Sequence, residues 1–476
     1  MKSIDTIYIK GKFVTPHGTE RFTLVDPVTE QEAAQVTLAD EIDAENAIAA
    51  AATAYRELAG SSREQRMHWL ARLHEVVADA EEELIATMIE EYGGPQGISV
   101  ATSKRAAASF DQARTLLADY PFERQVASAR VRMEPLGVVG LITPWNANYG
   151  MICSKLAMAI AAGSTAVIKP SELSARQTEL LTRVLHRAEV PAGLFNILTG
   201  RGDVVGAALV RHPGIAKVSF TGSTAVGKSI VRGSADTLKR VTLELGGKSP
   251  TILLDDADFD KAMPFIAAAA TMNSGQACLA GTRLLVPRTR LQEAEQGIVA
   301  AFQALKVGDP RDPETRIGPM VSASQYQRVQ GYIRKGIEEG ATLLLGGTGL
   351  PEGLESGYFV RPTVFSNVRN DMAIAKEEIF GPMLSLIAYD DEEDAIAIAN
   401  DTIYGLHAYV FSGDVARANR VARRIEAGRV FINGLYDEPM APFGGFKQSG
   451  LGREFGIFGL EEYLEPKTLL GYEQSL

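Results

Sequence analysis

A cysteine flanked by glycines is the side chain in this sequence best suited to covalent chemistry. Cys278 lies in the stretch 273-NSGQACLAGTR-283, after an alanine-rich helical pattern and before an apolar strand pattern. A cysteine thiolate adds readily to a carbonyl carbon, and glycines let a backbone approach a ligand closely. The alternative interpretation is an inert, buried cysteine, but such a residue has no need of flanking glycines. We therefore predict that Cys278 is a nucleophile.

Two polar residues follow apolar strand patterns, at the position where open α/β sheets place their ligands. Glu244 ends the pattern in 243-LELGGKSP-250, and Asn146 follows another in 143-TPWNANYG-150. A carboxylate there can act as a general base, and an amide N–H can donate to a developing oxyanion. The alternatives are a structural acid paired with Lys248 and an N-cap for the helix that follows Asn146.

These candidates need a scaffold, and the hydrophobic pattern predicts an α/β fold. From about residue 137, short apolar runs alternate with helical patterns, which is typical of βαβ units in a parallel sheet. The expected strands of this first, doubly wound sheet are 137–143, 165–169, 194–198, 216–220 and 240–245. After Gly246-Gly247 the alternation begins again, with expected strands at 251–255, 282–286, 407–411 and 429–433.

The alternation predicts two domains and an arm. Residues 1–118 and 138–246 are expected to form a cofactor-binding domain, and residues 247–446 a catalytic domain. The segments 119–137 and 460–476 carry isolated strand-like patterns with no evident partner in their own domain. Such strands are free to pair across subunits, so we expect them to form a small strand-based oligomerisation arm.

Composition excludes several classes of function. The 59 acidic residues outnumber the 48 Lys and Arg, which gives a net charge of −11, so phosphate backbones and anionic membranes would repel the chain. No N-terminal stretch resembles a signal peptide, and no apolar run is long enough to span a bilayer. The chain has only two cysteines, which fits a reducing compartment, and no residue cluster has zinc spacing. We expect a cytoplasmic protein that uses no metal and binds neither nucleic acid nor membranes.

Eight motifs in a fixed order resemble those of the aldehyde dehydrogenase superfamily, and the resemblance runs over almost the whole length. The motifs are TPWN (143–146), IKPSE (168–172), FTGSTAVG (220–227), LELGGKSP (243–250), GQAC (275–278), EEIFGP (377–382), YGL (404–406) and PFGGFKQSGLGRE (442–454). One such motif would be suggestive, whereas eight in order are specific.

The resemblance implies a role for each matched position. Cys278 would be the nucleophile, Glu244 the base that activates water, and Asn146 would share an oxyanion hole with the Cys278 backbone N–H. The residues implied for the dinucleotide are Lys169 and Glu172 at the adenosine ribose, Glu378 at the nicotinamide ribose, Gly222, Ser223 and Trp145 near the pyrophosphate, and Phe380 near the nicotinamide ring.

The resemblance also implies the reaction, which is NAD(P)-dependent oxidation of an aldehyde to a carboxylic acid through a cysteine thioester. Relatives that pass the acyl group to coenzyme A typically lack the glutamate, so Glu244 favours hydrolysis to a free acid. Glu172 should accept hydrogen bonds from a ribose and repel a 2′-phosphate, which favours NAD and leaves NADP possible. A clean G-x-G-x-x-G is absent, because the nearest match, 200-GRGDVVG-206, has one residue too many.

The substrate is predicted from departures within these motifs. Many relatives continue TPWN with a bulky aromatic residue, where this chain has Ala147. The small side chains of Ala147 and Ser154 predict a wide aldehyde tunnel, and Lys155 is expected to support its helix rather than a substrate carboxylate. We therefore predict an uncharged aromatic or medium-chain aliphatic aldehyde. The alternatives are a semialdehyde, or an amino-aldehyde if Asp437 and Glu438 lie at the entrance.

Two other functions compete with this interpretation. A cysteine hydrolase would need a histidine beside the thiol, and none of the six histidines lies in the motifs of Cys278, Glu244 or Asn146. A non-catalytic descendant would have no need to keep these three residues. The family resemblance also implies a homodimer or homotetramer.

Overall fold

A doubly wound sheet forms the centre of the first half of the molecule. The computed structural model describes residues 2–436 and 438–471. Five parallel strands make up the middle of the sheet, and the order along it is β12-β11-β8-β9-β10. Their bounds are β8 (Val138–Thr143), β9 (Thr165–Pro170), β10 (Phe195–Ile197), β11 (Lys217–Thr221) and β12 (Arg240–Glu244). The fold class predicted from the alternation is therefore confirmed for this half.

Helices cover both faces of this sheet. Alternate residues of a strand point to opposite faces, and in β8 Val139 and Leu141 pack into one core cluster while Val138 and Ile142 pack into another. Helices α2, α4, α5 and α6 supply the first cluster, and α1, α7 and α8 supply the second. The helices of this half are α1 (Glu41–Leu58), α2 (Arg63–Asp79), α3 (Glu81–Tyr92), α4 (Gln96–Asp119), α5 (Asn148–Ala162), α6 (Ala175–His186), α7 (Ala207–Arg211) and α8 (Thr224–Ser234).

A second α/β sheet follows the double glycine at 246–247. Its order is β15-β16-β17-β14-β13-β18-β19, and all neighbours are parallel except the pair β15 and β16. The strands are β13 (Pro250–Leu253), β14 (Arg283–Pro287), β15 (Thr342–Leu345), β16 (Thr363–Ser366), β17 (Met383–Tyr389), β18 (His407–Phe411) and β19 (Arg429–Ile432). Its main helices are α9 (Phe259–Ala270), α10 (Leu291–Gln303), α11 (Ala323–Glu338), α13 (Glu392–Asn400) and α14 (Val415–Ala422).

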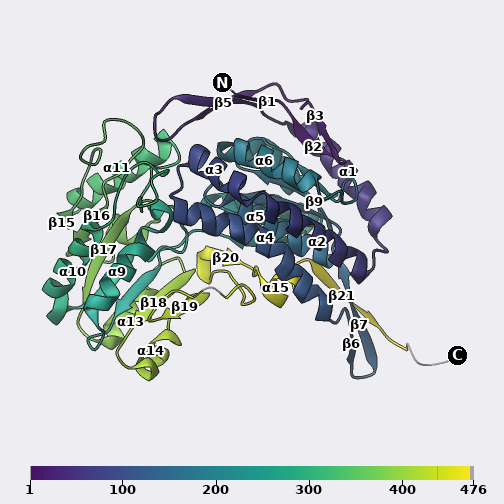
Figure 1. The fold of residues 1–476 in the computed structure, drawn as a ribbon. Helices are drawn as coiled ribbons and strands as arrows, with labels where there is room; N and C mark the ends of the chain where they lie inside the picture. The colour runs from purple at the N-terminus through teal and green to yellow at the C-terminus, as the bar shows by residue number, and fades with distance from the viewer. Residues whose placement is uncertain (1, 437, 472–476) are drawn as a thin grey trace.

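Chain segments near both termini join the two halves. The short strand β20 (Gly450–Leu451) returns to the first sheet and pairs antiparallel with β12, while β2 (Ile7–Ile9) and β3 (Lys12–Val14) close its other edge. A small sheet of β1 (Lys2–Ile4), β4 (Arg21–Val25) and β5 (Glu32–Thr37) lies across the top of the molecule in Figure 1. The loop between β4 and β5 reaches the second half, where Tyr358 N donates to Pro27 O at 2.9 Å.

The two segments without evident partners pair with each other. β6 (Glu123–Val126) and β7 (Ala129–Pro135) form a hairpin, and β21 (Leu464–Leu469) pairs antiparallel with β7 from Leu464↔Pro135 to Leu469↔Arg130. Each segment, which has no evident partner in its own domain, thus finds one in the other, although the paired residues lie more than 300 residues apart in the chain. The expected role of this sheet in oligomerisation stays a prediction. The resulting three-stranded sheet projects from the body beside the C-terminus (Figure 1). No described helix is long and apolar enough to cross a membrane.

Candidate active site

A cavity of about 280 Å³ lies where the two halves meet, and it contains all three predicted catalytic residues. The strands β8 and β11 are neighbours in the first sheet, yet the chain leaves β8 in one direction and returns to β11 from the other. Ligands bind outside the carboxyl ends of strands at such a switch point. The second half contributes residues that precede its strands. The lining includes Asn146, Met151, Glu244, Cys278, Gln325, Arg328, Glu378 and Phe380.

The loop that carries Cys278 is held in a left-handed backbone conformation. Asn273, Ser274 and Gly275 have φ values of 54°, 59° and 75°, a region that glycine adopts without cost and other residues adopt with strain. A Cβ on Gly275 would lie 2.1 Å from the carbonyl carbon of Gly381. This close packing fixes the turn just before Cys278.

Asn146 is hydrogen-bonded to the loop that carries Cys278 and does not cap a helix. Its side-chain Nδ2 donates to the backbone carbonyl of Gln276 at 2.9 Å, and its backbone carbonyl accepts from Asn273 Nδ2 at 2.9 Å. The helix α5 has Ala147 as its N-cap residue, so the capping alternative is wrong. An amide carries two N–H donors, and Gln276 O uses one of them. The second is available to an oxygen atom beside Cys278.

Glu244 is a buried carboxylate without a hydrogen-bond donor. Its exposed fraction is 3%, and neither side-chain oxygen has a hydrogen-bond partner within the described residues. Lys248 Nζ is equally buried and also has no partner there, so the structural pair of Glu244 with Lys248 is not formed. Burial, reinforced by the negative charge of Glu454, raises the pKa of Glu244 well above its usual range. An unpaired buried carboxyl group facing a cavity is suited to take a proton from a ligand or a water molecule.

The Cys278 thiol faces the same cavity, and its side chain is partly accessible. The surrounding protein desolvates a thiolate, and the carboxylates of Glu378 and Glu244 repel it, so the pKa of Cys278 rises to about 12. The other cysteine, Cys153, is fully buried in the core. These environments distinguish a thiol that a ligand can reach from an inert one.

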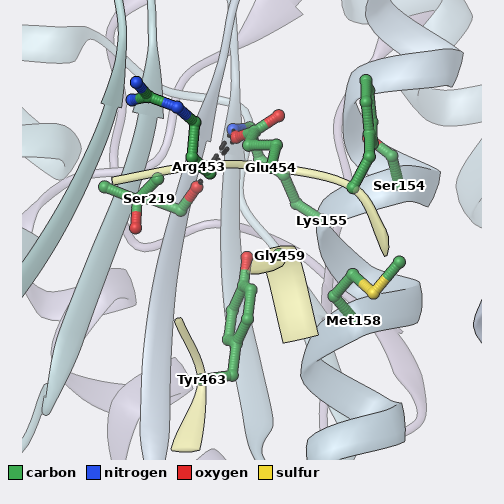
Figure 2. Close-up of a pocket in the computed structure, with 10 residues that line it drawn as sticks. Ser154, Lys155, Met158, Ser219, Arg453, Glu454, Gly459 and Tyr463 are labelled. Atoms are coloured by element: carbon green, nitrogen blue, oxygen red, sulfur yellow. Dashed lines mark hydrogen bonds and ion pairs between the residues drawn. The ribbon is translucent and has the colours of Figure 1, made fainter. Parts of the chain in front are cut away.

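A second, much smaller cavity of about 10 Å³ has Ser154, Lys155 and Glu454 in its lining (Figure 2). Lys155 Nζ forms an ion pair with Glu454 and donates to Ser219 Oγ at 3.0 Å. Ser154 lines this cavity and is not among the lining residues of the one at Cys278, so its place in an aldehyde tunnel stays a prediction. Lys155 does more than support its helix, because it neutralises a buried carboxylate that acts electrostatically on Glu244.

A groove of about 830 Å³ continues from the cavity along the carboxyl ends of the first sheet. Lys169 Nζ and Glu172 Oε2 lie 3.1 Å apart in it, at the end of β9. Ser223 is the N-cap of α8, and a Cβ on Gly222 would lie 2.4 Å from the ring of Phe220. The exposed N–H groups of a helix start suit a phosphate, and the pair beside β9 offers a donor and an acceptor to a ribose. The groove therefore fits a dinucleotide.

Glu378 stands where the groove meets the cavity. Its Oε1 accepts from Gly247 N at 3.1 Å, and a Cβ on Gly246 would lie 2.4 Å from its Oε2. Burial raises the pKa of Glu378 to about 7. Arg328 Nη2 donates to the backbone carbonyl of Glu378 at 2.6 Å, which holds the loop in place. The double glycine thus makes room for the Glu378 carboxylate.

Aromatic rings complete the wall at this junction. Trp145 and Phe380 meet edge to face with ring centroids 5.5 Å apart, and Gln325 Nε2 donates to Phe380 O at 2.7 Å. Phe380 has a φ of 63°, so its position is imposed by the surrounding contacts. Sequence reasoning missed Gln325 and Arg328, because α11 lies in a long helical stretch with no motif that distinguishes its cavity-facing turn.

Among the described residues, the site has neither a histidine nor a metal-binding cluster. None of the described histidines lines the cavity at Cys278. His407 is buried between Phe431 and Phe443, and burial lowers its pKa to about 3. Within residues 2–436 and 438–471, no group of three or more His, Cys, Asp or Glu side chains could hold a metal ion. Asp437, expected at a substrate entrance, lies outside the described residues.

Comparison with known proteins agrees with this geometry. Residues 13–469 match the model of the "Aldehyde dehydrogenase family". A 3-succinoylsemialdehyde-pyridine dehydrogenase from a Pseudomonas species is 44% identical over 478 residues, covering all of both chains. A crystal structure of an aldehyde dehydrogenase C mutant from Pseudomonas syringae, in complex with NAD⁺ and octanal, is 45% identical with a TM-score of 0.97 and covers 99% of this chain and 98% of that one. Betaine aldehyde dehydrogenase from Staphylococcus aureus, in complex with NAD⁺, is 33% identical with a TM-score of 0.96 and covers 99% and 95% of the two chains.

Proposed function

The chain belongs to the aldehyde dehydrogenase family, and from that membership we propose that it oxidises an aldehyde to the free carboxylic acid through a thioester on Cys278. The observation that carries the proposal is the buried, unpartnered carboxyl group of Glu244 in the same cavity as the accessible thiol. A thioester formed on Cys278 needs a water molecule to release the acid, and Glu244 is the group that can deprotonate it.

Each side chain of the site has a separate role in the proposed reaction. The Cys278 sulfur adds to the carbonyl carbon after losing its proton, and the carbonyl oxygen becomes an oxyanion. The free N–H of the Asn146 amide and the Cys278 backbone N–H stabilise that charge. A bound NAD would supply the hydride acceptor, and loss of a hydride from this carbon would restore the carbonyl and leave the thioester. Glu244 then takes a proton from water, the hydroxide adds to the thioester carbon, and the carbon–sulfur bond breaks to release the acid and the thiolate.

We propose an uncharged aromatic or medium-chain aliphatic aldehyde as the substrate. The apolar Met151 lines the cavity beside Asn146, and the one basic side chain in the lining, Arg328, donates to the backbone of the Glu378 loop. The similar proteins support the same class, since one is named for a pyridine-bearing semialdehyde and the other holds octanal. The alternatives are a semialdehyde with a carboxylate and an amino-aldehyde, the latter suggested by the similarity to betaine aldehyde dehydrogenase.

We propose NAD as the preferred acceptor. Five of the similar crystal structures contain NAD⁺, and the Glu172 carboxylate beside Lys169 suits a ribose hydroxyl better than a phosphate. The proposed site comprises Lys169 and Glu172 at one ribose, Glu378 at the other, and Gly222, Ser223, Trp145 and Phe380 between and beside them.

The test is NADH formation by the purified protein with neutral, acidic and amino aldehydes, using NAD and NADP in parallel. Cys278→Ala should abolish turnover. Glu244→Gln should release about one equivalent of NADH and then stall, with the acyl group on Cys278 detectable by mass spectrometry. Absence of activity with every aldehyde would discredit the reaction, and rapid repeated turnover by Glu244→Gln would discredit the role of this base.

A further inference from the structure

The segment 200-GRGDVVG-206, which has one residue more than a G-x-G-x-x-G motif, has an unusual local structure. A G-x-G-x-x-G spacing after Gly200 and Gly202 would place the third glycine at 205, whereas here it is Gly206. The segment Gly202–Gly206 forms a π-helical turn, in which Ala207 N bonds to Gly202 O, and α7 follows directly. A π-turn accommodates one additional residue in a helix and is frequent at functional sites. The extra residue is therefore absorbed without displacing Gly206 from the groove.

The turn places a carboxylate at the ribose end of the groove. Gly202, Asp203 and Gly206 all line the groove together with Lys169 and Glu172. A Cβ on Gly202 would lie 4.0 Å from Lys169 Nζ, so the backbone of the turn passes directly beside this cation. Asp203 is exposed, and none of the described residues gives its carboxylate a hydrogen bond or an ion pair.

The charges around this point are predominantly negative. Lys169 Nζ is paired with Glu172 at 3.1 Å, and the guanidinium of Arg201 is paired with Glu20 at 2.6 Å. Asp203 is thus a third carboxylate beside two cations that are already paired. The other basic residues of the groove, Arg211 and Arg232, lie near the far ends of α7 and α8. Eight residues of helix separate Arg211 from Asp203, which corresponds to roughly 12 Å.

From this arrangement we propose that Asp203, presented by the π-turn, is a specificity-determining residue that excludes a 2′-phosphorylated dinucleotide and so makes the protein selective for NAD. The inference rests on the proposed function, which places the adenosine ribose at Lys169 and Glu172. A 2′-phosphate on that ribose would bring about two negative charges to a point that already holds an excess carboxylate. Glu172 is held beside Lys169, whereas the Asp203 carboxylate has no cation of its own among the described residues and adds a net negative charge.

The test is to measure the dissociation constants of NAD and NADP with no aldehyde present. Asp203→Asn keeps the size of the side chain and one acceptor oxygen, replaces the other oxygen with an N–H₂ donor, and removes the charge. It should tighten NADP binding by roughly tenfold and change NAD binding less than twofold. Glu172→Gln should instead weaken NAD as well as favour NADP. Asp236→Asn, which removes one charge outside the groove, is the matched control and should leave both constants unchanged.

Ionic strength gives a second readout that a structural role would not affect. Salt screens an exposed charge, so raising NaCl should narrow the difference between NAD and NADP in the wild type and have a smaller effect in Asp203→Asn. An NADP constant in Asp203→Asn equal to that in Asp236→Asn would overturn the proposal and leave the reaction untouched. Failure of the wild type to bind either dinucleotide would overturn the cofactor assignment together with it. Selective binding of NAD without oxidation of any aldehyde would contradict the proposed reaction but would still support the role of Asp203.

Discussion

At the scale of single residues, the site is governed by the charges around one buried carboxyl group. Glu244 has no hydrogen-bond partner in the described part of the chain, so burial and nearby charges alone set its protonation. Glu454 raises the pKa of Glu244, and Lys155 lowers it. These two residues form an ion pair (Figure 2) and neither lines the cavity at Cys278, so a substitution at either one should change the pH dependence of the reaction without removing a contact to the substrate.

The ion pair predicts opposite pH shifts for two substitutions. Glu244 acts as a base only when deprotonated, so kcat should fall as the pH drops through its raised pKa. Glu454→Gln removes a negative neighbour and should move this acid limb to lower pH, whereas Lys155→Met removes a positive neighbour and should move it to higher pH. Profiles of kcat against pH test this. The control is the double variant, which removes both neighbours and should return the acid limb of the profile toward its wild-type position. Acid limbs that moved in the same direction in the two single variants would refute the electrostatic account.

The thiol makes a separate prediction. With a pKa of about 12 for Cys278, only a minute fraction of the cofactor-free protein holds a thiolate at neutral pH. Alkylation by iodoacetamide should therefore accelerate about tenfold for each pH unit between 7 and 9. Mass spectrometry should locate the label on Cys278, and the Cys278→Ser variant should remain unlabelled because Cys153 is fully buried. A rate that levels off near pH 7 would mean that the thiolate is far more stable than the surrounding burial implies.

At the scale of elements, tight turns hold the catalytic groups, and one glycine is decisive. Gly275 has a φ of 75°, and a Cβ there would lie 2.1 Å from the Gly381 carbonyl carbon. Gly275→Ala should lower stability by about 2 kcal/mol and abolish aldehyde oxidation, because the turn before Cys278 must shift. Gly97 is the control, since it lies within α4 with open space around it, and Gly97→Ala should raise stability by about 0.5 kcal/mol. Thermal unfolding compares the two, and an active, fully stable Gly275→Ala variant would contradict the packing argument.

Strands could be predicted from the sequence where a short stretch of residues carries the hydrophobic pattern by itself. The apolar runs at β8 and β9 are buried throughout, so they stand out as nearly continuous hydrophobic segments. The pairing of β7 with β21 and the contacts of Arg328 with the Glu378 loop join residues far apart in the chain, and no local pattern encodes them. The spacing mismatch at 200–206 was visible, but its resolution as a π-turn depends on how α7 packs against the sheet.

At the scale of the whole molecule, the active site joins opposite ends of two sheets. Asn146, Gly222 and Glu244 follow strands of the first sheet, whereas Lys248, Glu378 and the Cys278 loop precede strands of the second. The first sheet places its residues at the switch point, as doubly wound sheets do. The second sheet faces the cleft with its amino ends, so its motifs could not be located by the same rule. A substrate is thereby held between a dinucleotide groove and a nucleophile that different halves supply.

The arm makes the last prediction, which concerns assembly. The sheet of β6, β7 and β21 has two open edges within the described residues. Val126, at the end of β6, and Leu470, directly after β21, are exposed by 54% and 78%. A three-stranded sheet with unpaired edges and exposed apolar residues is suited to pairing with another chain. We therefore expect the predicted homo-oligomer to form through this arm. Truncation after Glu465 removes most of β21 and should give a species of smaller mass than the full chain, which light scattering coupled to size-exclusion chromatography would measure. Truncation after Gly471 keeps β21 whole and is the control. An unchanged mass after truncation at Glu465 would contradict the role of the arm in assembly.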